Sequence, residues 1–348
     1  MNIKRGLVLP GGGAKCAVQV GGIKALFKNG IGIDKVSSTS GGSLNGAMLC
    51  QGKYQLLFDL WDETGRTSGS TISKTYLAEF KDGSLAPNIE QLKSILTYGI
   101  NFGDKIGLIT KKGQAKFIHK VIENGKSIDK LMDNSPLFGI LEQNVKKADY
   151  LIDQHITLVS LYDGALYTLT QNSFLTDHDL HLGLLASSSM PGIWAPIPEI
   201  KLADGTSIFD AVDGGLRSSS PLPQMMAALD RECPWEVDAI NPNSIHQMIN
   251  KTKKNLITQA GSSIDIMLNE GLQRDIKITK RINGWALDDP AWALRNGIIY
   301  APINNIEAPL DKEGNPLLGK TLDFRSEWIQ KRISIGYDSM MRHLDNAA

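Results

Sequence analysis

The chain is poor in cysteine and has no net charge. Its 348 residues include only Cys16, Cys50 and Cys233, whose spacing fits neither a zinc site nor a disulfide framework. So few thiols favour a reducing compartment, and we expect a cytoplasmic protein. Lys plus Arg and Asp plus Glu both number 37, so no overall positive field attracts nucleic acid. Nucleic acid is therefore excluded as the expected main partner.

Long apolar runs are also missing. No stretch approaches the roughly 20 apolar residues that cross a bilayer. The start, MNIKRGLVLPGGG, is basic, but its apolar part stops at Pro10, which is too short for a signal peptide, so we expect a mature cytosolic start. Because 42% of the residues are hydrophobic and 21% charged, the composition is that of a globular protein.

The remaining pattern predicts a parallel sheet covered by helices. Residues 4–10 form a short apolar run that predicts a buried strand, and 17–30 predict a helix closed by Gly30. A second strand ends in the serine-rich stretch VSSTSGGSLNGAM at 36–48, which leads into another helix, and 53–65 predict a third. This β-turn-α-β-turn-α start is typical of an α/β fold with helices on both faces of the sheet.

The rest of the chain contains a helix-rich part followed by further strands. Residues 66–150 show helical candidates at 88–98, 113–124 and 136–147 and no convincing strand, so we expect a helical cap or insertion. It should cover or border an apolar pocket through YLAEF (76–80), ILTYGINF (95–102) and SPLFGIL (135–141), with an ordinary packed outer layer as the alternative. Asp163-Gly164 and Asp204-Gly205 predict hairpin turns within 155–170 and 199–215. Further strands are expected at 235–242 and 297–304, and a helix at 326–344. No linker divides the chain, so we expect one domain over 1–348.

A glycine run stands between the first strand and the first helix. Gly11, Gly12 and Gly13 let several backbone N–H groups face one point, and together with Ala14 they predict an anion or oxyanion site. A dinucleotide fingerprint requires glycine where Cys16 stands, and its acidic residue should end the second strand, whereas Asp34 precedes that strand. A Walker loop needs Gly-Lys-Ser/Thr, which is missing. A plain turn without a ligand stays open as an alternative.

One serine has the surroundings of a nucleophile. A nucleophile at a strand-to-helix turn needs small residues two positions away on each side, and Ser40 has Ser38 and Gly42 there. Ser43 falls within the predicted helix and Ser37 within the strand. A structural turn remains the alternative for this stretch.

A catalytic serine needs a base. Asp213 ends a predicted strand and precedes Gly214 and Gly215, which let the backbone turn and leave the carboxylate accessible. None of the six histidines stands in such a small-residue turn. The sequence therefore favours Ser40 and Asp213 as a nucleophile and base pair.

These motifs together resemble the patatin-like phospholipases. GGGAKC at 11–16 resembles their Gly-Gly-Gly-x-Arg/Lys-Gly oxyanion loop, STSGG their Gly-x-Ser-x-Gly elbow, and VDGG their Asp-Gly-Gly motif. ASSSMPGIWAPI at 186–197 is similar to the segment that precedes that aspartate, and LDF with the C-terminal helix is similar to the end of the family domain. The order agrees from residue 4 to about 344, loosest over 66–150. Cys16 and Ser38 depart from the family pattern, since glycine is usual at both positions.

The resemblance implies a three-layer α/β/α fold with a mostly parallel central sheet, and a lipid acyl hydrolase with a Ser40–Asp213 dyad. It implies an oxyanion loop around Gly12, Gly13 and Ala14, supporting roles for Lys15, Gly42, Gly214 and Gly215, and neither a metal nor a cofactor. The implied substrates are phospholipids or other acyl-ester lipids, met by transient peripheral contact with a membrane. The oligomeric state is open, a homo-oligomer included.

Two further functions remain open at this stage. One is an α/β-hydrolase-type esterase whose Ser-Asp-His triad uses His343 or His246, although that fold places its elbow deeper in the sheet. The other is a regulatory module without enzyme activity that binds a nucleotide at the glycine loop. A patatin-like protein that no longer catalyses the reaction is a third alternative.

Overall fold

The computed structural model describes residues 3–81, 84–98, 116–117, 119–120, 123–124, 128, 130–243, 256–312 and 317–347. Its main sheet has eight strands: β1 (Lys4–Leu9), β2 (Lys35–Thr39), β7 (Asp153–Ser160), β8 (Leu166–Thr170), β9 (Ile197–Lys201), β10 (Ser207–Asp213), β11 (Trp235–Ile240) and β12 (Ile303–Ile306). Their order is β12-β11-β1-β2-β7-β10-β9, with β8 paired to β7. Neighbours from β12 to β7 run parallel, whereas β8, β9 and β10 join through antiparallel pairs.

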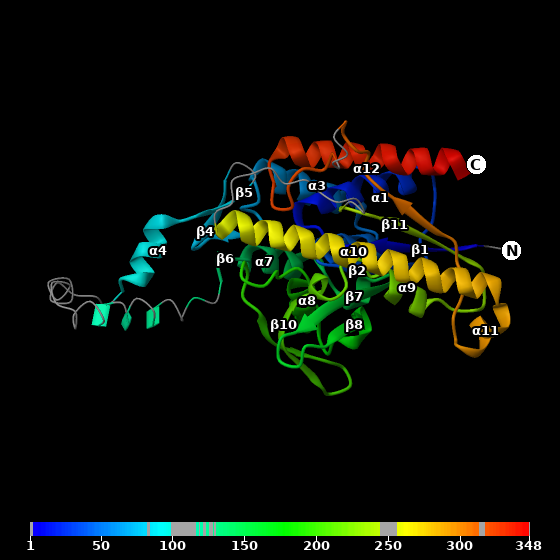
Figure 1. Cartoon of the computed structure of the whole chain (residues 1–348), viewed down its shortest axis with the longest axis horizontal. Helices are drawn as coiled ribbons and strands as arrows, with labels where there is room; N and C mark the ends of the chain where they lie inside the picture. Colours follow the sequence, from blue (N-terminus) through cyan, green and yellow to red (C-terminus); the bar gives the residue numbers. More distant parts are fainter. Residues whose placement is uncertain are drawn as a thin grey trace.

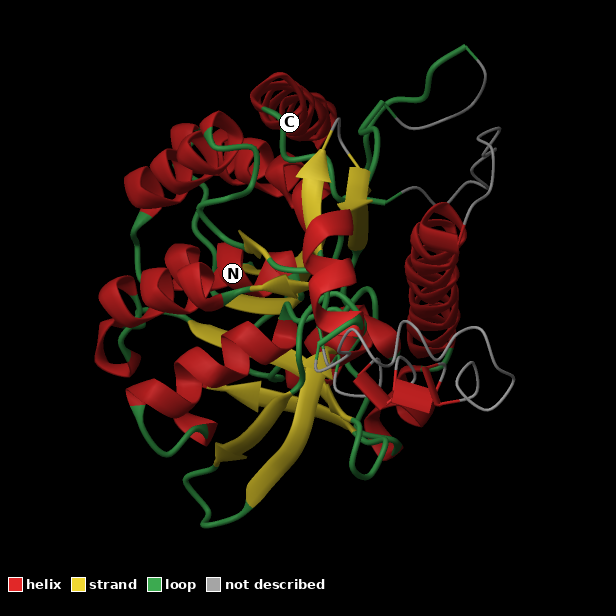
Figure 2. Cartoon of the chain, turned by 90° about the vertical axis from the view of Figure 1, so that its left-hand side faces the viewer, coloured by secondary structure: helices red, strands yellow, loops and turns green. Residues whose placement is uncertain are grey.

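Helices cover both faces of this sheet (Figure 2). They are α1 (Ala17–Lys28), α2 (Gly41–Cys50), α3 (Tyr54–Arg66), α4 (Ile89–Leu96), α7 (Ser135–Asn144), α8 (Asp177–Ser187), α9 (Leu222–Ala228), α10 (Leu256–Asp288), α11 (Pro290–Arg295) and α12 (Ser326–Ala347). Residues of β1 alternate between the two faces: Leu7 and Leu9 join the core under α1, α2 and α12, whereas Val8 joins the core under α9 and α10. The predicted mostly parallel α/β/α fold is confirmed.

The C-terminal helix packs closely on the first helix (Figure 1). A Cβ atom at Gly21 of α1 would lie 1.9 Å from the carbonyl oxygen of Ile333, and one at Gly336 of α12 would lie 1.8 Å from that of Val18. The backbones of α1 and α12 therefore contact each other directly at Gly21 and Gly336. This close crossing ties the end of the chain to the helix that follows the glycine loop.

Most predicted elements match the structure to within a few residues. The hairpins around Asp163-Gly164 and Asp204-Gly205 are β7-β8 and β9-β10, and both glycines have positive φ. The strand expected at 297–304 lies later, at Ile303–Ile306, and the 33-residue helix α10 was not predicted as one element. None of the helices that the structure describes has the length and apolar character to cross a bilayer.

The expectation that 66–150 lacks strands is wrong. The described part of this span contains β3 (Lys74–Thr75), β4 (Ala78–Lys81), β5 (Ser84–Pro87) and β6 (Met132–Asp133), paired as β3-β6 and β4-β5. These strands are two to four residues long, too short to show an alternating pattern in the sequence. The predicted helices 88–98 and 136–147 appear as α4 and α7, and half of 113–124 lies outside the described residues.

Candidate active site

Ser40 stands at the sharp turn between β2 and α2. Its φ of 57° and ψ of −133° are a backbone conformation that residues other than glycine rarely adopt. Such strain costs on the order of 1–3 kcal/mol and persists only where the surroundings enforce it. The side chain is 5% exposed. The turn therefore holds the hydroxyl at one fixed point beyond the end of the strand.

The residues around this turn explain its small-residue pattern. A Cβ at Gly42 would lie 2.1 Å from the carbonyl oxygen of Leu9, so only glycine fits where α2 passes β1. Ser38 takes the place of the usual glycine because it faces Gly46, and its hydroxyl accepts a hydrogen bond of 2.9 Å from the side-chain amide of Gln154. The departure at Ser38 is thus accommodated without opening the turn.

Strand β7 brings the serine and the aspartate together. Thr39, the last residue of β2, pairs with Thr157, and Asp213, the last residue of β10, pairs with the adjacent Leu158. The Oγ atom of Ser40 donates a hydrogen bond of 2.6 Å to Oδ2 of Asp213. The two residues are 173 positions apart in the chain, and the sheet register places them side by side.

The carboxyl group of Asp213 is buried and weakly acidic. Burial raises its pKa to about 6, although the hydrogen bond from Ser40 and another of 2.7 Å from the Gly215 N–H to Oδ1 act in the opposite direction. A Cβ at Gly214 would lie 2.5 Å from the hydroxyl oxygen of Thr157, so the turn after Asp213 requires glycine there. A carboxylate with this pKa is a stronger base than a solvated one and is still ionised at neutral pH.

The glycine loop offers fewer N–H groups than the sequence predicted. The N–H of Gly11 donates to the carbonyl of Ser219 at 3.0 Å, and that of Ala14 donates to the carbonyl of Thr321 at 2.8 Å. Both groups are therefore already used, which removes Gly11 and Ala14 from the expected set of oxyanion donors. The accepting carbonyl groups of Ser219 and Thr321 belong to segments that no sequence pattern predicted to lie beside the loop.

Three other N–H groups remain near Ser40. Those of Gly12, Gly13 and Gly41 donate to no acceptor within the described parts of the chain. Gly13 and Gly41 line the same pocket as Ser40, and Gly41 is the first residue of α2, where helix N–H groups lack intrahelical partners. Gly41 was not among the predicted donors, although its position directly after the serine is a recognisable signal.

The loop is supported by buried polar groups. Asn243 donates from Nδ2 to the Gly11 carbonyl at 2.8 Å and accepts at Oδ1 from Nζ of the buried Lys15 at 3.4 Å. A Cβ atom at Gly41 would lie 3.0 Å from the Cys16 sulfur, so the cysteine fits there because Gly41 has no side chain. Burial raises the pKa of the Cys16 thiol, which makes it an inert packing group.

The C-terminal helix also supports the loop, which the sequence did not indicate. Arg332 of α12 is fully buried, and its guanidinium donates to the carbonyls of Leu318, Lys320 and Asp323, at 2.6–2.8 Å, and to that of Ala14 at 3.2 Å. Burial lowers its pKa to about 10. One side chain therefore joins the glycine loop to the segment that runs into α12.

Ser187, at the end of α8, positions the elbow from the other side. Its Oγ accepts a hydrogen bond of 3.1 Å from the Ser40 N–H and donates one of 2.7 Å to the Thr157 carbonyl. Ser189 accepts the Asp213 N–H at 3.0 Å through its carbonyl. The segment ASSSMP therefore contacts both halves of the Ser40–Asp213 pair, a role that its resemblance to the family motif did not specify.

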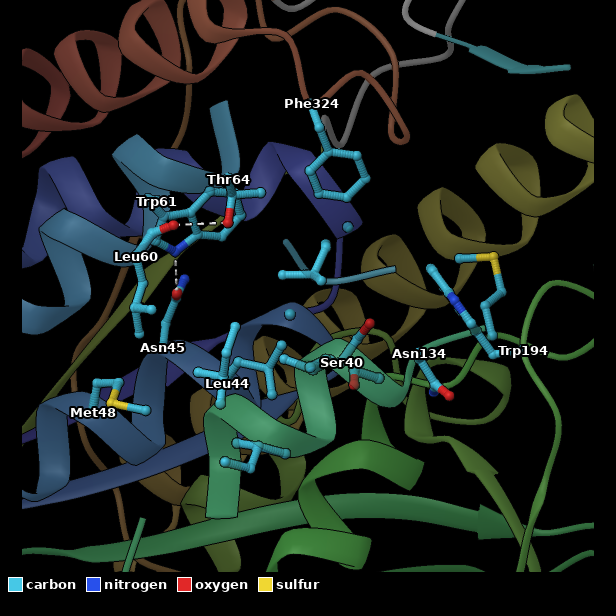
Figure 3. Close-up of a pocket in the computed structure, with 18 of the residues that line it drawn as sticks. Ser40, Leu44, Asn45, Met48, Leu60, Trp61, Thr64, Asn134, Trp194 and Phe324 are labelled. Atoms are coloured by element: carbon cyan, nitrogen blue, oxygen red, sulfur yellow. Dashed lines mark hydrogen bonds between the residues drawn. The ribbon is translucent and has the colours of Figure 1, made fainter. Parts of the chain in front are cut away.

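An apolar pocket with a cavity volume of about 100 Å³ opens beside Ser40 and Asp213 (Figure 3). Most of its walls are aliphatic and aromatic side chains of α2, α3 and α7, joined by Met190, Trp194, Leu322 and Phe324. From the span 66–150, Ile72, Asn134, Leu137, Ile140 and Leu141 line it. The span thus borders the pocket through α7, whereas the described residues of YLAEF (76–80) and of ILTYGINF (95–102) do not line it, and 99–102 lie outside the described residues.

The histidines stand elsewhere in the described structure. The Nε2 atom of His343 lies 3.4 Å from Oδ1 of Asp238, and that of His181 lies 2.7 Å from the Val145 carbonyl oxygen. Among the described residues, no histidine lines the pocket or bonds to the Ser40–Asp213 pair. His343 is therefore not placed to form the alternative triad, and His246 lies outside the described residues.

The alternative nucleotide site also lacks its acidic residue. Asp34 lies before β2, where it accepts the Arg5 N–H at 2.7 Å. Because β1 and β2 are parallel, the glycine loop after β1 and Asp34 before β2 stand at opposite ends of these strands. Asp34 cannot contact a ligand held by the glycine loop.

One group of possible metal ligands lies away from this site. Side chains of Glu236, Asp238 and His343 approach one another closely. Arg5, however, forms ion pairs with both carboxylates, and the Asn304 side-chain amide donates to both at 2.7 and 2.9 Å. All four carboxylate oxygens are thus already bonded within the protein, and we assign no metal site there.

Fold and site together define an α/β protein in which a serine at a strand-to-helix turn donates a hydrogen bond to a buried aspartate, with an apolar pocket beside both residues. A sequence model of the patatin-like phospholipases matches residues 7–226. The chain belongs to the patatin-like phospholipase family, and this membership supports lipid acyl hydrolase activity in general. The chain is also similar to VipD from Legionella pneumophila, at 14% identity and a TM-score of 0.39 over 99% of this chain and 67% of that one. No curated protein matches it.

Proposed function

We propose that this protein hydrolyses acyl esters of phospholipids, or of similar lipids, through a Ser40–Asp213 dyad. The single observation that carries the proposal is the 2.6 Å hydrogen bond from Ser40 Oγ to the buried carboxylate of Asp213, next to an apolar pocket. A nucleophile, a base of raised pKa and apolar walls are what lipid ester hydrolysis requires.

The reaction has two halves. Ser40 Oγ attacks the acyl carbonyl carbon while its proton passes to Oδ2 of Asp213, and the N–H groups of Gly12, Gly13 and Gly41 stabilise the oxyanion. Asp213 then gives the proton to the departing alkoxide, which leaves as the lysolipid, and the acyl group stays on Ser40. In the second half, water attacks the acyl group, Asp213 takes a proton from that water and returns it to Ser40 Oγ, and the fatty acid is released.

The proposal extends to the setting of the reaction. The whole chain, residues 1–348, acts as one domain in the cytoplasm and contacts lipid surfaces transiently. Support comes from the pocket walls, which are formed by residues from several parts of the chain, including Phe324 beyond the family match. A phospholipid must leave its bilayer at least in part for its ester to reach Ser40, which is 5% exposed.

Fatty-acid release from mixed phospholipid vesicles tests the proposal. We expect the wild type to release fatty acid, and Ser40→Ala to lose nearly all of this activity. Ser37→Ala is the matched control, because Ser37 is a buried serine of β2, the strand that leads to Ser40, and its hydroxyl donates to the Pro221 carbonyl at 3.0 Å, away from Asp213. Equal rates for wild type and Ser40→Ala would refute the role of Ser40, and no release by the wild type would refute the function.

A further inference from the structure

Three helices each contribute one row of side chains to the pocket. The lining residues recur every third or fourth position, along α2 from Gly41, along α3 as far as Thr64 and along α7 from Leu137. This spacing is one face of a helix. The pocket is therefore a three-sided trough whose direction is set by the helix axes, rather than an irregular gap between loops.

All three rows of side chains extend from the neighbourhood of Ser40 toward the same end of the pocket. Helix α2 begins directly after Ser40, so Met48 is its most distant lining residue, as Figure 3 shows. Helix α3 follows α2 after a connection of three residues and packs back on it through the Trp61–Asn45 hydrogen bond, so Leu57 lies toward the far end of α2 and Thr64 toward its start. Helix α7 follows Asn134, which lines the pocket and whose Nδ2 donates to Ser189 Oγ at 3.0 Å. Its most distant lining residue is Leu141.

These three distant residues form the floor of the trough. Met48, Leu57 and Leu141 are 3%, 2% and 1% exposed, and all belong to the main hydrophobic core. On the other side of Ser40 lie Asn134 and Trp194 (Figure 3). A chain that enters the trough from Ser40 therefore ends against packed core side chains.

The depth of the trough follows from helix geometry. Met48 lies eight residues beyond Ser40, which at about 1.5 Å per residue is about 12 Å along the axis of α2. Carbon–carbon bonds of about 1.5 Å at angles near 111° advance an extended chain by about 1.25 Å each, so about ten carbons fit. Seven residues separate Leu57 from Thr64 on α3, which gives a similar depth of about 10 Å.

We propose that Met48 closes the acyl pocket, so that the pocket holds about ten carbons of an acyl chain and gains no affinity from further carbons. The inference rests on the proposed function and specifies the substrate of that same site. Met48 is the floor residue on the helix that carries Ser40, so its distance from the nucleophile is fixed by α2 itself. The wall opposite is fixed as well, because the Trp61 indole N–H donates to Oδ1 of Asn45, also on α2, at 2.7 Å.

The limit can be measured with and without turnover. Binding of saturated fatty acids from hexanoate to palmitate to the Ser40→Ala protein is followed by isothermal titration calorimetry. We expect affinity to rise about fourfold per added methylene up to about ten carbons and then to level off. The kcat/KM of the wild type for p-nitrophenyl esters of the same acyl chains should show the same limit.

Variants of the floor move the limit in opposite directions. Met48→Ala removes three side-chain heavy atoms and should extend the limit by about two carbons, which raises affinity for dodecanoate about 15-fold. Met48→Phe should shorten it. Met340→Ala is the control for loss of a buried methionine, since Met340 is fully buried in α12 and does not line the pocket, and it should leave the limit unchanged.

The outcomes separate the two proposals. Affinity that rises through palmitate in the Ser40→Ala protein, or a limit that Met48→Ala and Met48→Phe leave in place, overturns the role of Met48. A limit that moves with Met48 in the binding experiment, while the wild type hydrolyses no ester, overturns the proposed function and supports the pocket assignment.

Discussion

Replacing Asp213 by asparagine should have opposite effects on activity and on stability. Asparagine keeps the shape of the side chain but cannot accept the proton of Ser40, so we expect fatty-acid release to fall by a factor on the order of 10³ or more. The stability effect follows from the environment of the carboxyl group. Asp213 is 3% exposed and its two polar partners, Ser40 Oγ and the Gly215 N–H, are neutral.

The magnitude can be worked from the raised pKa. Burial raises the pKa of Asp213 to about 6, against about 3.9 in the unfolded chain. Because the pKa is higher in the folded state, the folded protein binds this proton more tightly than the unfolded chain does. The contribution of proton binding at Asp213 to the free energy of unfolding is therefore fully present below pH 4 and is lost as pH rises through 6. At pH 8 the buried charge therefore costs the folded state about 3 kcal/mol, which asparagine avoids. With about 2.1 cal/mol/K of unfolding entropy per residue, the melting temperature should rise by about 4 °C.

The measurement is calorimetric unfolding of wild type and Asp213→Asn at pH 4, 6 and 8, with the hydrolysis assay on the same samples. Asp238→Asn is the matched control: Asp238 is also fully buried, but it pairs with Arg5, so its loss should lower the melting temperature at pH 8. An Asp213→Asn effect on melting that is the same at all three pH values would show that the carboxyl group does not titrate as described. Hydrolysis near the wild-type rate would show that another group is the base.

Three further predictions use the same site. The kcat/KM of the wild type should rise about tenfold per pH unit below pH 6 and level off above it, because Asp213 must be ionised to accept a proton; a profile flat from pH 4 to 8 would contradict this. Ser40→Gly should be about 1 kcal/mol more stable than Ser40→Ala in denaturant unfolding, because glycine adopts the φ of 57° without strain; equal stabilities would mean that the turn is unstrained. Gly13→Ala should lose activity and about 2 kcal/mol of stability, since its φ is 53° and its Cβ would lie 2.7 Å from the Thr321 carbonyl oxygen, whereas Gly139→Ala, with nothing within 4 Å, should be neutral or slightly stabilising; similar losses in both would contradict the close approach.

The sequence was informative where a function depends on local backbone geometry. The turn at Ser40, the glycine after it at Gly42 and the turn after Asp213 each need small residues at fixed spacings, and such patterns are visible in a single chain. The hairpins at Asp163-Gly164 and Asp204-Gly205 were predictable for the same reason, because both glycines adopt positive φ. Apolar periodicity indicated the first strands and helices and the C-terminal helix, but not the short strands β3 to β6 or the length of α10.

Long-range hydrogen bonding was not predictable in this way. That the N–H groups of Gly11 and Ala14 are already used depends on Ser219 and Thr321, which lie about 200 and 300 residues further along the chain. The buried guanidinium of Arg332 and the hydroxyl of Ser187 act on the site through similar long-range contacts. An arginine or a serine in a helix has no local pattern that marks it as such a partner.

The amino-acid sequence alone predicted the α/β fold and indicated Ser40 and Asp213 as the proposed nucleophile and base, because turns and periodicity are encoded over a few neighbouring positions. Tertiary structure decided which N–H groups are left to face a substrate and how deep the apolar trough is. Both depend on where α2, α3, α7 and α12 pack, and packing joins side chains that are far apart in the chain. The distance from Ser40 to Met48 sets the depth of the trough only because α3 and α7 form its other two sides.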